Sequence, residues 1–177
     1  SLITLLDNVI ITNTEYYSTS SAVDYFVSKK NINFTSNVNI IMNESVSNII
    51  YIKCSKAVYE FFDNKKKYKL RNNVIVDYPR DNSIVYCNLL DYDMNEKITY
   101  ISESPSITNT QNNMLIISDV MTKYDKTKQM VITGNVKIID KKNNAFSDYA
   151  VYNQNTGIIK LYGNPKLISD NNIFKSE

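Results

Sequence analysis

A four-residue phrase recurs along this chain at intervals of about thirty residues, and it restricts the possible folds more than any other feature. Each copy begins with a small polar residue, which is followed by Val or Pro and then by alternating apolar residues. We call the small polar residues the anchors: Asn8, Asn37, Asn73, Ser104, Asn135 and Asn164. Successive anchors are 29, 36, 31, 31 and 29 residues apart. A period of this length is typical of stacked repeats.

Two further positions repeat in phase with the anchors. An aromatic residue lies 11 or 12 positions before each anchor except the first, at Tyr25, Phe61 or Phe62, Tyr92, Tyr124 and Tyr152. An apolar residue lies three positions before the same anchors, at Phe34, Leu70, Ile101, Ile132 and Leu161. Three positions that keep one register over five intervals indicate a structural repeat.

Each repeat has the alternation of β-strands. Val136 and Ile138 point one way while Lys137 points the other. Residues 153–157 resemble a hairpin turn, and further turns are expected at 63–64, 93–96 and 125–127. The long interval contains Lys65, Lys66 and Lys67, which we expect to form an exposed loop tip.

The repeat predicts an all-β fold. A single hairpin of this size cannot bury its apolar face, whereas stacked repeats share a continuous interior. We therefore expect residues 1–177 to form a single domain, an elongated β-sandwich or jelly roll of stacked antiparallel repeats that is open at both ends. Its side walls should face water through Lys, Asn, Asp and Ser.

Composition argues against several functions. The chain lacks His, the commonest general base and metal ligand, and two cysteines alone cannot hold zinc. A net charge of +2 does not indicate a nucleic-acid surface, and no apolar run is long enough to span a membrane. Asp91 and Asp93 could serve acid–base chemistry, but they fall in a predicted turn. We expect no enzyme, no metal and no cofactor.

The fifth repeat contains sequence motifs that resemble those of a known family. It reads Gly134-Asn135-Val136, then Ala145-Phe146-Ser147-Asp148-Tyr149-Ala150-Val151-Tyr152, then Asn155-Thr156-Gly157, and finally Leu161-Tyr162-Gly163-Asn164-Pro165. This is similar to the LptA/OstA-like family of periplasmic lipopolysaccharide-transport proteins, which includes LptA, LptC and the N-terminal domain of LptD. Earlier repeats depart from the pattern, since Asn72-Asn73-Val74 and Glu103-Ser104-Pro105 replace the Gly-Asn corners.

The resemblance implies a twisted β-jelly roll that binds lipopolysaccharide and forms a transport bridge between the inner and outer membranes. It places the chain in the periplasm, associated with a membrane either through a removed N-terminal segment or through partners. Partners would be other Lpt-type jelly rolls joined by end-to-end strand pairing, or further copies joined head to tail. Two alternatives are the soluble N-terminal domain of an outer-membrane lipopolysaccharide-assembly protein and a structural β-repeat with a filled core.

Alternation and the repeat register select the side chains that should face the interior. They are Phe34, Val38, Ile40, Leu70, Val74, Val76, Ile101, Ile132, Val136, Ile138, Ala150, Tyr152, Ile159 and Leu161. Ordinary core packing explains each of them at least as well as contact with lipid does, unless the two walls stand apart. Whether Cys54 and Cys87 form a disulfide stays open: the periplasm permits one, but equivalent positions in an antiparallel winding are expected to lie far apart.

Overall fold

The computed structural model describes residues 1–14, 16–45, 48–62, 65–169 and 172–175. Within this part of the chain there are fifteen β-strands and one short 3-10 helix, η1 (Pro79–Asp81). The strands are β1 (Leu2–Thr12), β2 (Tyr16–Phe26), β3 (Asn31–Ser45), β4 (Asn48–Phe62), β5 (Lys65–Tyr78), β6 (Ser83–Asp93), β7 (Ile98–Ser102), β8 (Ser106–Asn109), β9 (Met114–Ile117), β10 (Val120–Tyr124), β11 (Gln129–Ile139), β12 (Asn143–Asn153), β13 (Ile158–Tyr162), β14 (Lys166–Ser169) and β15 (Asn172–Lys175). The all-β prediction is confirmed.

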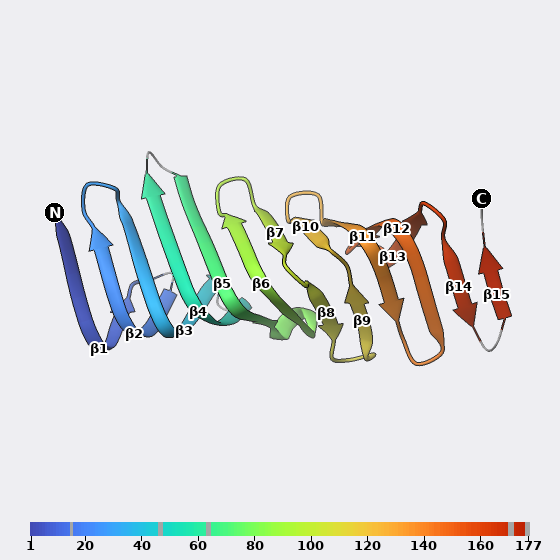
Figure 1. The fold of residues 1–177 in the computed structure, drawn as a ribbon, viewed down its shortest axis with the longest axis horizontal. Helices are drawn as coiled ribbons and strands as arrows, with labels where there is room; N and C mark the ends of the chain where they lie inside the picture. Colours follow the sequence, from blue (N-terminus) through green and yellow to red (C-terminus); the bar gives the residue numbers. More distant parts are fainter. Residues whose placement is uncertain (15, 46–47, 63–64, 170–171, 176–177) are drawn as a thin grey trace.

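Hydrogen bonds join the fifteen strands into one sheet in which every pairing is antiparallel. The strands follow one another along the long axis of the molecule, with the two termini at opposite ends (Figure 1). The elongated, stacked architecture expected from the repeat is therefore present.

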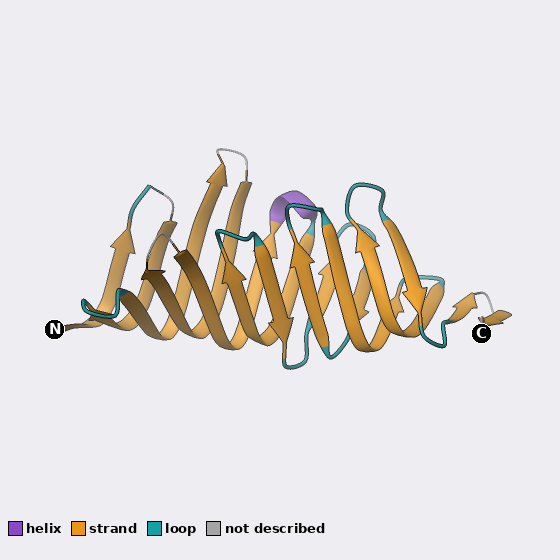
Figure 2. Ribbon diagram, turned by 90° about the horizontal axis from the view of Figure 1, so that it is seen from above, coloured by secondary structure: helices purple, strands orange, loops and turns teal. Residues whose placement is uncertain are grey.

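The sheet is bent along its length into two walls, and Figure 2 shows the strands curving along one side of the molecule. Long strands cross the bend, and their pairing register shifts there, for example between Thr35 and Val38. Other strands are broken at the bend: β7 pairs with one half of β6, and β8 pairs with the other. We call wall A the side formed by β7, β10 and β13 together with the halves of the long strands that pair on the same side of the bend. Wall B is the side with β8, β9, β14, β15 and the other halves.

The anchors lie at this bend. Every anchor and the residue before it have positive φ, at Asp7-Asn8, Ser36-Asn37, Asn72-Asn73, Glu103-Ser104, Gly134-Asn135 and Gly163-Asn164. Asn and Gly tolerate this left-handed backbone best, which explains why Asn recurs there. Each repeat therefore begins at a fold line of the sheet.

A small residue faces the Val or Pro that follows each of the first five anchors. Val9 pairs with Ser20, Val38 with Cys54, Val74 with Cys87 and Val136 with Ser147, while Ser118 donates its backbone N–H to Pro105. Four of these side chains donate to the carbonyl two residues ahead: Ser20, Cys54, Ser118 and Ser147, at 3.0 to 3.2 Å. Little room exists inside the bend, so a small side chain that satisfies its own backbone fits there.

The residue after two of these serines, Asp119 after Ser118 and Asp148 after Ser147, connects its repeat to the next bend. Asp119 accepts a hydrogen bond from Asn135 Nδ2 at 2.9 Å, and its backbone N–H donates to the Gly134 carbonyl. Asp148 makes the same pair of bonds with Asn164 and Gly163. The last two fold lines are thus each held by an aspartate from the neighbouring repeat.

The positions three before the anchors form the centre of the interior. Phe34, Leu70, Ile101 and Ile132 are all buried, and Leu161 packs against them from its half-buried position. Among the aromatic positions, Tyr25 is half-buried and in ring contact with Phe61, while Tyr92 and Tyr152 are half-buried against the core. In the repeat before Asn135, Lys123 occupies the position 12 residues before the anchor, and Tyr124 is shifted by one residue.

Cys54 and Cys87 are free and buried. They belong to β4 and β6, which β5 separates, so their backbones lie about 10 Å apart, two strand spacings. A disulfide needs roughly 4.4–6.8 Å between Cα atoms. The two thiols therefore occupy bend positions that serines fill in the other repeats.

Two expectations are wrong. Lys65, Lys66 and Lys67 do not form a loop tip; they begin β5, since the long repeat extends its strands, and β4 has 15 residues where β12 has 11. Asp91 lies within β6 and pairs with Arg71 at 2.6 Å, so the turn begins only after Asp93. The expected turn at 63–64 lies outside the described residues.

The outer surface is less polar than expected. Tyr17, Tyr51, Tyr86 and Tyr100 alternate with inward-facing neighbours and are each about two-fifths exposed. Tyrosine carries an apolar ring with a polar tip, so it satisfies strand propensity on a wet face.

Candidate ligand-binding cavity

A cavity of about 640 Å³ lies between the two walls in the middle of the molecule. Its lining runs from Met42 and Tyr68 near the N-terminal side to Met130, Tyr152 and Gln154 toward the C-terminal side. The first β-strands do not line it. A volume of this size is typical of sites for small or medium-sized ligands.

The part of the cavity nearest the bend is apolar and tightly packed. Leu70, Val76 and Leu90 line it and are buried, and Leu70 has no exposed surface. Tyr78, Met114 and Tyr152 line it closer to the strand tips and are half-buried. The room therefore lies toward the tips, because the walls already touch along the fold line.

Charged side chains gather where the cavity meets the strand tips. Five lining residues are cationic, Arg80, Lys97, Lys123, Lys126 and Lys128, and two are acidic, Asp81 and Asp125. The cavity thus combines an apolar floor with a predominantly positive rim. Such a gradient suits an amphiphile with an anionic head group.

Lys123 is the cation set deepest in this rim. It takes the interior position that an aromatic residue holds in other repeats, and its side chain is 16% exposed. Its ammonium group lies 2.9 Å from the Asp125 carboxylate and 5.0 Å from the centre of the Tyr78 ring. Wall A and wall B therefore meet through this lysine.

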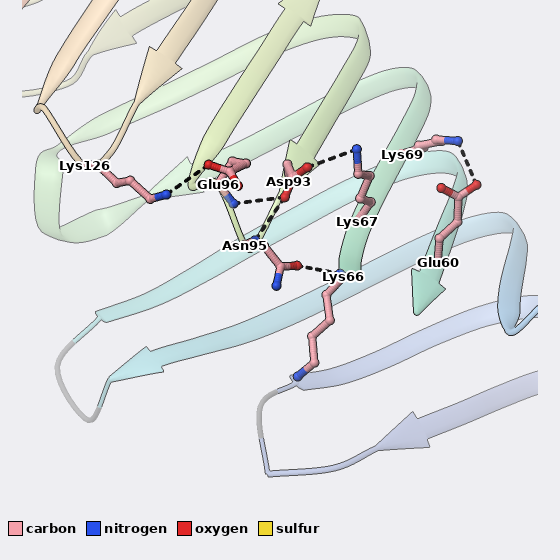
Figure 3. Close-up of polar contacts among 8 residues, drawn as sticks. All are labelled: Glu60, Lys66, Lys67, Lys69, Asp93, Asn95, Glu96 and Lys126. Atoms are coloured by element: carbon pink, nitrogen blue, oxygen red, sulfur yellow. Dashed lines mark hydrogen bonds and ion pairs between the residues drawn. The ribbon is translucent and has the colours of Figure 1, made fainter. Parts of the chain in front are cut away.

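The hairpin tips of wall A are tied to one another. Lys126 pairs with Glu96 at 3.1 Å across neighbouring hairpins, and Asn95 Oδ1 accepts the backbone N–H of Lys66 at 2.8 Å (Figure 3). Asp93 pairs with Lys67 and also accepts backbone N–H groups from Asn95 and Glu96. These bonds, chiefly the one from Glu96, hold the pKa of Asp93 below its ordinary value. They fix the rim from which the lysines project.

The fourteen predicted interior residues all face the space between the walls. Eleven are buried: Phe34, Val38, Ile40, Leu70, Val74, Val76, Ile101, Ile132, Val136, Ile138 and Ala150. Tyr152, Ile159 and Leu161 are half-buried against them. Only Leu70, Val76 and Tyr152 line the cavity. Their role in lipid contact stays a prediction.

The sequence reasoning missed most of the lining because it stayed close to the anchors. Tyr68, Thr99 and Met130 lie five residues before an anchor, and Met42, Tyr78 and Asn109 lie five residues after one. The same alternation, continued toward the strand tips, would have found them. The walls separate with distance from the bend, so those outer positions border the cavity.

A periodic lysine was also missed. Lys30, Lys66, Lys97 and Lys128 each lie seven residues before an anchor, and Gly157 takes this position in the last repeat. Lys30, Lys97, Lys128 and Gly157 have left-handed backbone at the hairpin tips. Successive lysines are two strand spacings apart, about 10 Å. The repeat thus places a row of lysines near the hairpin tips of wall A, and two of them, Lys97 and Lys128, line the cavity.

No group of three or more His, Cys, Asp or Glu side chains among the described residues could hold a metal ion. No helix in the described part of the chain has the length and apolar character to cross a membrane.

The fold is similar to that of proteins with solved structures, of which one is described below. No protein-family model matches the chain, and no curated protein does. One solved structure to which this chain is similar is that of LptH, the LptA homologous periplasmic component of the conserved lipopolysaccharide transport device from Pseudomonas aeruginosa. The match spans 84% of this chain and 82% of LptH, with 8% sequence identity and a TM-score of 0.33.

Proposed function

We propose that this chain is a periplasmic protein that binds lipopolysaccharide or a related glycolipid and passes it along a bridge between the inner and outer membranes. The observation that carries the proposal is the cavity between the walls, with its apolar floor and its cationic rim. The sequence motifs of the fifth repeat, which resemble those of the LptA/OstA-like family, support a glycolipid as the ligand.

An apolar floor is sufficient to hold acyl chains. Each CH₂ group moved out of water contributes about 0.8 kcal/mol, so a chain gains affinity without any specific polar contact. The lining residues Met42, Met114 and Met130 adapt well to such chains, because methionine is unbranched and flexible. Transport requires binding that is reversible, which a non-directional site provides.

The rim supplies the contact for an anionic head group. Lys97 and Lys128 lie on neighbouring hairpin tips of wall A, and Arg80 lies on wall B opposite them. No ion pair joins these three cations to a carboxylate within the described residues. Phosphate groups on a glycolipid would provide the missing countercharge.

Site-specific photo-crosslinking tests the proposal. A photoreactive side chain at Met114 or Tyr152, both half-buried in the lining, should label lipopolysaccharide on irradiation in the presence of the purified glycolipid. The same group at Tyr100, which faces outward, is the matched control and should not. Labels confined to the protein at all three positions would reject lipid binding and support a structural β-repeat with a filled core, which the full burial of Leu70 and Ile132 favours.

A second measurement isolates the rim. Replacing Lys97 and Lys128 together by Gln should weaken lipopolysaccharide binding about tenfold and reduce its dependence on salt. Replacing Lys53 and Lys137, outward-facing lysines of wall B, should leave both unchanged. Equal losses in the two double variants would show that the net charge of the protein, and not the rim, governs binding.

The exposed strand edges suggest how a bridge would be extended. Leu6 and Ile10 on β1 are 67% and 60% exposed, and Ile173 and Phe174 on β15 are 58% and 57% exposed. Apolar edges with unpaired backbone groups are templates for strand addition. We include in the proposal that β1 of one molecule pairs with the C-terminal edge of another copy or of a related jelly roll.

A further inference from the structure

The interior is divided by a cluster of three tyrosine rings. Tyr16 belongs to wall B, whereas Tyr59 and Tyr68 are paired neighbours on wall A. The Tyr59 and Tyr68 rings stack with 4.6 Å between centroids, and Tyr16 meets them edge-on at 5.9 and 6.4 Å. All three are buried. We call them the tyrosine cluster, and it spans the space between the walls.

The tyrosine cluster lies where the cavity ends. Met42 and Tyr68 line the cavity at its N-terminal side, and the strands that carry them pair with β2 and β4. Tyr16 pairs with Met42, and Tyr59 pairs with Tyr68, so both rings lie one strand beyond the lining. Neither Tyr16 nor Tyr59 lines the cavity.

Beyond the cluster the interior is filled. The Phe61 ring is tilted against Tyr59 and stacks on Tyr25, with 5.5 and 6.2 Å between ring centroids. Val23, Phe34 and Val38 are buried with exposed fractions of 2% or less. The N-terminal repeats therefore have a packed core, and the room for a ligand begins at Tyr68.

Tyr16 is held in place by its own turn. Asn13 Oδ1 accepts the backbone N–H of Tyr16 at 2.8 Å, and the backbone N–H of Asn13 donates to the Tyr16 carbonyl. This pair fixes the start of β2 and directs its first inward side chain across to wall A. Edge-to-face contacts between aromatic rings add stability beyond the area they bury.

We propose that the tyrosine cluster is the end wall of the chain-binding cavity, and that Tyr16 sets the longest apolar chain that the cavity accepts. This inference rests on the proposed function, because it assigns a specificity-determining residue to the same cavity. A chain that enters from the rim or from the C-terminal side is expected to stop at the rings. Longer chains gain nothing from carbons that remain in water.

The test measures affinity against chain length. Alkyl phosphates of about 8 to 18 carbons, kept below their micelle concentrations, are titrated calorimetrically into the whole chain. For the wild type, affinity should rise about fourfold per CH₂ and then level off. In Tyr16→Ala the levelling should occur at a chain longer by several carbons, while Tyr16→Phe should keep the wild-type value.

The control variant is Tyr25→Ala, which removes a ring from the filled region without touching the cavity. It should lose stability yet level off at the wild-type length. Tyr16→Leu serves where Tyr16→Ala fails to fold, because it keeps apolar volume but does not reach wall A.

The outcomes separate the two proposals. If Tyr16→Ala or Tyr16→Leu is folded and levels off at the wild-type length, the end-wall assignment is overturned while the proposed function stands. If the wild type binds no alkyl phosphate of any length and also fails to label lipopolysaccharide, the proposed function itself is overturned.

Discussion

At the scale of single residues, the fold line depends on pairs of left-handed residues. The recurring Asn anchors could be recognised from the sequence because Asn is a known turn former. Their preceding partners could not, since Asp7, Ser36 and Glu103 share no side-chain chemistry that marks positive φ. Their backbone conformation is imposed by the neighbouring strands, which a single sequence does not display.

Gly134 offers a direct test of the bend. An added Cβ would clash with Asp119 Oδ2 and lie 2.9 Å from Asp119 Cβ, and φ is +75°. Gly134→Ala should therefore lower the free energy of unfolding by about 2–4 kcal/mol. Gly157→Ala, with φ +69° but open space around it, should cost only about 1 kcal/mol. Urea denaturation measures both, and equal losses would show that backbone strain, not the contact with Asp119, requires glycine.

The cysteines can be exchanged for the residue that other repeats use. Burial raises the pKa of the Cys54 thiol to about 12 and that of Cys87 to about 11, so both are protonated at neutral pH. Cys54→Ser should change stability by less than about 1 kcal/mol, because Ser20, Ser118 and Ser147 make the same bond to the carbonyl two residues ahead. Cys54→Val, which cannot donate, should cost more. A loss above about 2 kcal/mol for the serine variant would contradict the equivalence of these positions.

Asp93 should make the stability depend on pH in acid. Its folded-state pKa is lowered, so its contribution is complete above the unfolded-state value of about 3.9 and disappears as the pH falls through the folded-state value. Asp93→Asn keeps an oxygen for the Asn95 and Glu96 N–H groups but loses the charge that pairs with Lys67. The variant should be less stable than the wild type at pH values near 7, and the difference should vanish in acid. Urea midpoints across this range test it, and a difference that persists at low pH would argue against an electrostatic origin.

At the scale of elements, alternation located the strands but not their ends. The lysine run was predicted as a loop because three like charges in succession suggest exposure. It lies instead in β5, where Lys67 pairs with Asp93 and Lys69 pairs with Glu60. Cross-strand partners compensate the charges, and a partner distant in sequence cannot be read from the run itself.

The end strands predict a specific pattern of association. Ile10→Lys should block the N-terminal edge, and Ile173→Lys should block the C-terminal edge. Each variant alone should remain monomeric in sedimentation velocity at concentrations where the wild type forms longer species. An equimolar mixture should form dimers and nothing larger, because each copy retains one competent end. A mixture that stays monomeric, or a wild type that is strictly monomeric at high concentration, would exclude head-to-tail pairing.

At the scale of the whole molecule, the sequence predicted a stacked β-roll but not the distribution of its interior. Core packing and a ligand cavity both require inward apolar residues. Most of the fourteen predicted residues pack in the core, and only three of them line the cavity. The walls separate where the side chains that face each other from the two walls are too small to fill the space between them. The Tyr16–Tyr59–Tyr68 contact shows this, since Tyr16 comes from wall B of the first repeat while Tyr59 and Tyr68 come from wall A of the second.

Stability should vary along the long axis. Each strand is paired only with its neighbours, so local opening is expected to begin at the ends and to propagate inward. In hydrogen exchange, amides of β1 and of β14 and β15 should exchange first, and amides of β4, β5 and β11 should exchange last. Uniform protection along the chain would indicate a single cooperative unit instead.

The paired left-handed residues at the bend have a consequence for how such a protein can evolve. Each fold line is specified within its own pair of strands, by the anchor, its predecessor and the small residue opposite. Duplication or deletion of one thirty-residue segment of the gene would therefore leave the remaining fold lines intact. The length of the roll, and with it the distance that it spans, can change by whole units without redesign of the rest.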